Sequence, residues 1–135
     1  MQLDTIAGLL RLALITATPI ALGAYAGIMS ERAGIVNIAI EGMMLTTAMM
    51  SQLVAMYINV PIRAAFGNPA LGSPEAFPAA IISLILGLIV GLGTGALLGW
   101  LHAVVSIRFK ADQIISGTVI NIMAWALLAG RFSVR

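Results

Sequence analysis

The strongest constraint on this sequence is a set of four long segments that are almost free of charge. They cover residues 12–29, 35–57, 79–105 and 113–129, and Glu41 is the only Asp, Glu, Lys or Arg among them. A helix rises about 1.5 Å per residue, so roughly 17–25 residues cross the hydrocarbon core of a bilayer. The segments therefore predict an all-α integral membrane bundle of about four transmembrane helices, in a single domain embedded in the lipid bilayer.

The composition agrees with this class and excludes several others. Hydrophobic residues make up 61% of the chain and charged residues 9%, against roughly 25% charged in soluble domains. The net charge of +2 is small and scattered, so we expect no nucleic-acid partner. The chain has no cysteine, one histidine (His102) and one lysine (Lys110) outside any Gly-rich phosphate loop. We therefore expect no enzyme, no catalytic residue, no metal site and no cofactor on this chain.

Glu41 is the most informative polar residue. A charged side chain at the bilayer centre costs about 2.5–3.5 kcal/mol on insertion scales, so Glu41 needs a partner, water or a proton. It is either a pathway carboxylate or a buried acceptor that caps a broken helix or pairs with Arg32, and we favour the buried acceptor. Three amides share this choice between channel lining and interhelical hydrogen bonding. The candidate substrate pathway or buried polar network is therefore Asn37, Glu41, Gln113 and Asn121.

The third segment contains glycines at a strict spacing of four, which places them on one helical face. They are Gly87, Gly91, Gly95 and Gly99. Such a row lets a second helix approach closely, as in small-xxx-small packing. It predicts a helix-packing surface and indicates nothing about catalysis. Trp100 and His102, near the end of this segment, are assigned to the interfacial belt.

The connections between the segments suggest a topology. The Asn59–Pro78 stretch contains four of the five prolines and is predicted to lie outside. Within it, Ser73-Pro74-Glu75 is typical of a helix start with a hydroxyl cap. The loop with Arg108 and Lys110 is predicted to be cytoplasmic, because basic residues concentrate on that side.

Two stretches resemble a known family. Ser-Glu-Arg-Ala-Gly-Ile-Val-Asn-Ile-Ala-Ile-Glu-Gly-Met-Met (Ser30–Met44) and Arg-Phe-Lys-Ala-Asp-Gln-Ile-Ile-Ser-Gly-Thr-Val-Ile-Asn (Arg108–Asn121) are similar to permease subunits of bacterial ABC importers. Within that group the resemblance is to the nucleoside and simple-sugar type, related to the branched-chain amino-acid permeases. It implies part of a substrate pathway in the bacterial plasma membrane. It also implies three partners: a second permease subunit, a cytoplasmic ABC ATPase that binds the ATP, and an extracytoplasmic substrate-binding protein.

Members of that family continue well beyond the second stretch, with further helices and a segment that docks on the ATPase. We therefore expect this chain to be the N-terminal portion of an incomplete ABC importer permease, either a fragment or a truncated product. Two alternatives remain open. One is a small helical membrane protein with an assembly role, and the other is a fragment of an ion-coupled secondary transporter that uses Glu41 as a proton site.

Overall fold

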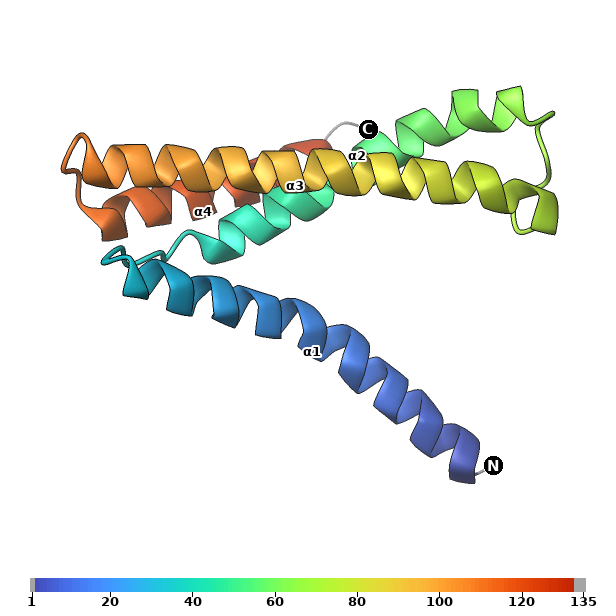
Figure 1. Ribbon diagram of the computed structural model, residues 1–135, viewed down its shortest axis with the longest axis horizontal. Helices are drawn as coiled ribbons and strands as arrows, with labels where there is room; N and C mark the ends of the chain where they lie inside the picture. Colours follow the sequence, from blue (N-terminus) through green and yellow to red (C-terminus); the bar gives the residue numbers. More distant parts are fainter. Residues whose placement is uncertain (1, 133–135) are drawn as a thin grey trace.

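Four long helices dominate the computed structural model, which describes residues 2–132 and the side chains of residues 4–130. They are α1 (Gln2–Arg32), α2 (Ile40–Ala65), α3 (Phe77–Ile107) and α4 (Gln113–Phe132), with a short 3-10 turn, η1 (Pro74–Ala76), before α3 (Figure 1). Each α-helix contains a span long and apolar enough to cross a membrane, and residues 2–132 contain no strand. The predicted all-α membrane fold is confirmed.

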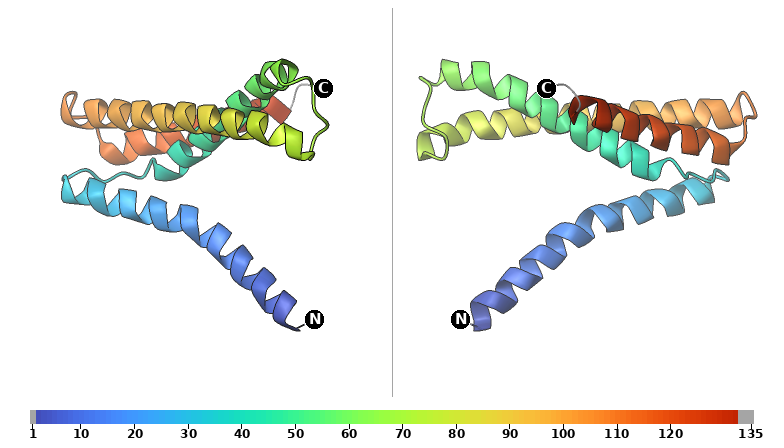
Figure 2. Two further views of the ribbon diagram at one scale, coloured as in Figure 1. Left: turned by 45° about the vertical axis from the view of Figure 1, so that its right-hand side comes forward. Right: turned by 180° about the vertical axis from the view of Figure 1, so that it is seen from behind.

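The helices are unevenly packed. Helices α2 and α3 run antiparallel side by side, and α4 returns beside the first part of α2 and the last part of α3 (Figures 1 and 2). Helix α1 diverges from the other three toward its N-terminus in every view. Its glycines approach α2 only in the second half of α1, where Gly23 lies beside Met44 and Gly27 beside Ile40. One side of α2 is therefore left without a covering helix over much of its length.

The seam between α2 and α3 is close because α3 presents glycines to it. A Cβ atom added to Gly87 would lie 2.6 Å from the Ser51 carbonyl oxygen, and one added to Gly91 would lie 3.0 Å from the Ser51 Cβ. A Cβ at Gly95 would lie 3.2 Å from the Thr47 hydroxyl, whereas one at Gly99 would meet nothing within 4 Å. Three of the four glycines in the row thus face α2, and Gly99 lies beyond the contact.

Helix α2 begins and ends at later residues than the apolar segment 35–57 from which it was predicted. The chain breaks at Gly34, where φ is +79°, and α2 starts only at Ile40 instead of at residue 35. At its other end α2 continues through Pro61 to Ala65, where the Asn68 N–H donates to the Arg63 carbonyl at 2.8 Å. Gly67, with φ of +82°, allows that turn. Residues 59–65 of the predicted outer loop are therefore helical.

Helical structure begins at Ser73-Pro74-Glu75 as predicted, but its first turn is the 3-10 turn η1 and it has no hydroxyl cap. Pro74 begins η1, and α3 follows directly from Phe77. The Ser73 hydroxyl is buried and makes no hydrogen bond, so the predicted hydroxyl cap is wrong. Pro74 and Pro78 have no N–H, which leaves fewer backbone donors in the first turns for a cap to satisfy.

Candidate functional site

The break between α1 and α2 is a stretch of irregular backbone between two candidate membrane spans. Residues 33–39 form no regular helix: Ile35 N–H still donates to the Ser30 carbonyl at 3.0 Å, and regular helical structure then stops until Ile40. Backbone N–H and carbonyl groups that are removed from water need hydrogen-bond partners, because an unpaired buried polar group is costly. The partners of this segment therefore define the site.

Two amide side chains of α4 make three hydrogen bonds to the break and to the first turn of α2. The Gln113 Oε1 accepts from the Val36 N–H at 2.6 Å. The Asn121 Oδ1 accepts from the Gly42 N–H at 2.8 Å, and its Nδ2 donates to the Ile38 carbonyl at 3.0 Å. Asn121 thus pairs one of the four N–H groups that the first turn of α2 cannot satisfy within the helix.

Gly117 makes this contact possible. It lies four residues from both Gln113 and Asn121, so the three residues share one face of α4. A Cβ at Gly117 would lie 3.0 Å from the Ala39 N, and one at Gly42 would lie 2.6 Å from the Asn121 Oδ1. Gly117 is not among the site residues that the sequence predicted. The four-residue spacing from Gln113 to Gly117 to Asn121 was the signal for a close approach.

Asn37 and Glu41 lie in different surroundings. The Asn37 Oδ1 accepts from the Ala39 N–H at 3.1 Å, a bond two residues along the chain that shapes the break from within. Glu41 is exposed in the first turn of α2, and its side chain makes no hydrogen bond or ion pair with the described residues. The bond to the break that the sequence suggested for Glu41 is made by Asn121 instead, and Arg32 is not its partner.

Two cavities adjoin the uncovered side of α2. The first, about 490 Å³, lies between α1, α2 and α3, and its polar lining residues are Asn37, Thr47 and Ser51.

The second cavity, about 400 Å³, lies toward the other end of α2 and is lined by Gln52, Asn59, Arg63 and Ser83 among others. Asn59 donates to the Ser83 hydroxyl at 3.2 Å, and Arg63 donates to the Pro69 carbonyl at 2.5 Å. Both cavities combine apolar walls with hydroxyl and amide groups.

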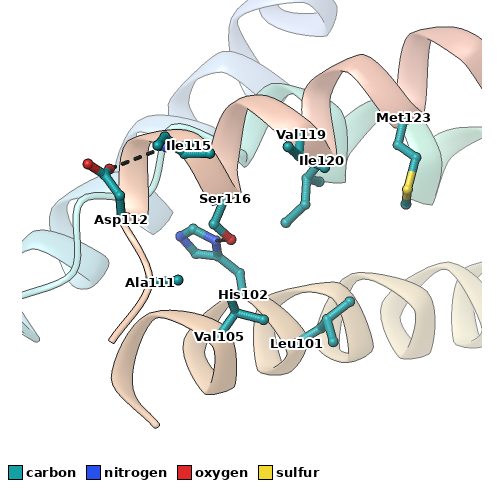
Figure 3. Close-up of a pocket in the computed structure, with 10 residues that line it drawn as sticks. All are labelled: Leu101, His102, Val105, Ala111, Asp112, Ile115, Ser116, Val119, Ile120 and Met123. Atoms are coloured by element: carbon teal, nitrogen blue, oxygen red, sulfur yellow. Dashed lines mark hydrogen bonds between the residues drawn. The ribbon is translucent and has the colours of Figure 1, made fainter. Parts of the chain in front are cut away.

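A third cavity, about 480 Å³, lies between α3 and the start of α4 (Figure 3). Its lining is apolar apart from His102, Asp112 and Ser116. His102 is only 2% exposed and its Nδ1 lies 3.2 Å from the Ser116 hydroxyl, so its assignment to the interfacial belt is wrong. The Asp112 carboxylate accepts from the Ile114 N–H at 2.8 Å and caps α4. These groups hold the α3–α4 hairpin together.

Comparison with known proteins identifies the family. The profile of the family described as "Branched-chain amino acid transport system / permease component" matches residues 9–132. The chain belongs to this permease family. The match includes all of the break, the α4 face bonded to it and the α2–α3 seam. The four spans of this permease chain and its family membership make it a multi-pass protein of the plasma membrane.

Curated relatives of the permease chain include two named for nucleosides. The nucleoside ABC transporter permease protein NupC of Lactococcus lactis is 37% identical over 84% of this chain and 31% of its own length. The guanosine ABC transporter permease protein NupQ of Bacillus subtilis is 35% identical over 82% of this chain and 30% of its own. The putative glucose ABC transporter permease protein TsgC13 of Haloferax volcanii is 31% identical over 90% of this chain and 30% of its own. The permease chain thus spans about a third of the length of these relatives, and no solved structure matches it.

Proposed function

We propose that this chain is a transmembrane component of an ATP-driven importer for nucleosides or simple sugars and forms part of the substrate pathway. The observation that supports this most directly is the 37% identity to a nucleoside permease over 84% of the chain. The relatives named for guanosine and glucose extend the proposed substrate class to sugars. All of these are uncharged polar molecules.

The cavities of the site suit such substrates. Their polar lining consists largely of amides and hydroxyls, of which Asn37, Thr47, Ser51 and Gln52 are examples. Groups of this kind form hydrogen bonds with the hydroxyls of a sugar or ribose without requiring a charge on the substrate. Arg63 is the charged lining residue in these two cavities, and it already donates to the Pro69 carbonyl.

The energy for import is proposed to come from other polypeptides. This chain contains no phosphate-binding loop, so ATP is proposed to bind a separate cytoplasmic ABC ATPase and this chain to need no cofactor. A second permease subunit would complete the pathway, and an extracytoplasmic binding protein would deliver the substrate. Glu41, Gln113 and Asn121 would then act within an assembly and not within an isolated helical protein.

Uptake in membrane vesicles that contain the assembled importer tests this proposal. Radiolabelled guanosine and glucose are supplied outside with the binding protein, and ATP is supplied or withheld on the ATPase side. We expect accumulation of at least one of the two substrates only with ATP, insensitive to a protonophore. Uptake that continues without ATP and stops when the proton gradient collapses would contradict the proposal and favour an ion-coupled transporter.

A further inference from the structure

One face of α2 contains a polar stripe that extends along almost the whole helix. Its members are Glu41, Ala48, Gln52, Asn59 and Arg63. Their distances from Glu41 are 7, 11, 18 and 22 residues, which are close to two, three, five and six helical turns at 3.6 residues per turn. We call these five residues the α2 stripe. Apart from Ala48, every member is polar or charged, and Leu45 is an apolar residue on the same face between Glu41 and Ala48.

The described helices leave the α2 stripe open along its middle and first turns. Helix α4 contacts α2 at Gly42, and α3 contacts it at Thr47, Ser51 and Ala55. Glu41, Ala48 and Gln52 are exposed, and the side chains of Glu41 and Gln52 have no hydrogen-bond partner among the described side chains and backbone groups. Helix α1 diverges toward its N-terminus (Figure 2), and it shares the 490 Å³ cavity with Ala48 but not with Glu41 or Gln52.

One of the two cavities beside α2 lies along this stripe, and the other meets the stripe only at its edge. Ala48 lines the 490 Å³ cavity, and Gln52, Asn59 and Arg63 line the 400 Å³ cavity. Three polar members of the stripe, Gln52, Asn59 and Arg63, therefore share one hollow in the second half of α2. Such a coincidence is expected of a surface that is in contact with water.

Lipid is a poor occupant for this surface. Polar residues in spans face the bundle interior or a water-filled cavity, and Gln52 lies near the middle of the Ile40–Ala65 span. A tightly packed partner helix is also a poor fit, because close membrane interfaces use small residues. The α2–α3 seam does so at Gly87 and Gly91, whereas the stripe presents the long side chains of Glu41 and Gln52.

We propose that the α2 stripe lines the water-filled substrate pathway, with Gln52 as a hydrogen-bonding contact for an uncharged polar substrate near the middle of the helix. This inference rests on the proposed transport function and deepens it. It separates Glu41 and Gln52, which face the pathway, from Gln113 and Asn121, which bind backbone at the break.

Single cysteines test the proposal directly, because the chain has none of its own. Ala48→Cys and Gln52→Cys are placed on the stripe. Leu53→Cys is the matched control, one residue further along and half-buried about 100° round the helix. Ile89→Cys is the lipid control, since Ile89 is 58% exposed on the face of α3 turned away from Gly87.

The assembled importer in vesicles is treated with a charged methanethiosulfonate, which reacts with thiolates in water. We expect both stripe positions to react about tenfold faster than either control, because thiolates form only where water reaches. Saturating guanosine should slow the reaction at Gln52→Cys. Reaction at both stripe positions no faster than at Leu53→Cys would overturn the inference and indicate a packed protein interface.

The unsubstituted importer is assayed for ATP-dependent uptake in the same vesicles. Uptake with unreactive stripe cysteines would contradict this inference alone. Absence of ATP-dependent uptake would contradict the proposed function itself. Ala48→Cys is a small change, so it keeps the test valid if Gln52→Cys does not accumulate in the membrane.

Discussion

Asn121, a residue of α4, makes hydrogen bonds to the backbone at the start of α2. Its amide both accepts from the Gly42 N–H and donates to the Ile38 carbonyl, which are two backbone groups on either side of the helix start. An amide offers a donor and an acceptor on the same planar end without carrying a charge. Neither an aspartate nor a leucine of similar size would satisfy both.

Substitution of Asn121 by alanine is therefore expected to destabilise the protein. It leaves the N–H of the buried Gly42 unpaired, at roughly 1–3 kcal/mol, and also removes the donor to the carbonyl of the exposed Ile38. The measurement is thermal unfolding of the purified protein in detergent, with Ile122→Ala as the control because Ile122 is exposed on the neighbouring position. Equal melting temperatures for the two variants would contradict the role assigned to Asn121.

Glu41 is expected to behave in the opposite way. It is exposed and accepts no hydrogen bond from the described residues, so neither Glu41→Gln nor Glu41→Ala leaves a buried donor unpaired. Both variants should accumulate in the membrane at the unsubstituted level, measured by quantitative immunoblotting beside Asn121→Ala. A strong loss of protein for Glu41→Ala, restored by Glu41→Gln, would instead show that the carboxylate is a buried acceptor in the assembled protein.

At the scale of helices, the distance between α2 and the glycine face of α3 increases along the α2–α3 seam. The space available to a Cβ atom increases from Gly87 through Gly91 and Gly95 to Gly99. Contacts nearer than about 3 Å to backbone force the two helices apart, because closely packed atoms have little room to yield. Helix α3 therefore packs most closely against α2 at Gly87, in the first half of α3.

Alanine substitutions along the row should reproduce this gradient. Gly87→Ala is expected to be the most destabilising, Gly91→Ala less so and Gly95→Ala least of the three. Gly99→Ala is expected to be neutral or to stabilise by about 0.5–1 kcal/mol, because alanine is the better helix former. Melting temperatures of the four variants provide the test. An unchanged value for Gly87→Ala would mean that the seam is looser than the structure describes.

The sequence predicted the elements better than their contacts. Long apolar runs depend only on local composition, so all four spans were found. The start of α2 was placed at residue 35 because Ile35 to Ile40 are mostly apolar, while the groups that pair with the broken backbone lie 77 to 83 residues away on α4. The burial of His102 was missed for the same reason, since Ser116 lies on another helix.

At the scale of the whole molecule, the α2–α3 and α3–α4 connections lie at opposite ends of the helices (Figure 1). Asn68 is in the first connection and Lys110 in the second, and both residues are exposed. If α3 crosses the bilayer, the two residues lie on opposite sides of it.

Single cysteines at Asn68 and Lys110 test this arrangement. In intact cells, a membrane-impermeant maleimide should label Asn68→Cys, and it should label Lys110→Cys only after the cells are permeabilised, since the basic loop is predicted to be cytoplasmic. Labelling of both positions in intact cells would contradict the crossing by α3. The reverse pattern would keep the crossing and invert the orientation.

The hydrogen bonds between the break and α4 also set an order of assembly during synthesis. A ribosome makes the break and α2 long before it reaches Asn121, which lies 79 residues beyond Gly42. Until α4 enters the membrane, the Val36 and Gly42 N–H groups and the Ile38 carbonyl have none of their final partners. The nascent chain therefore passes through a period in which the first turn of α2 is unfinished, and the insertion of α4 ends it.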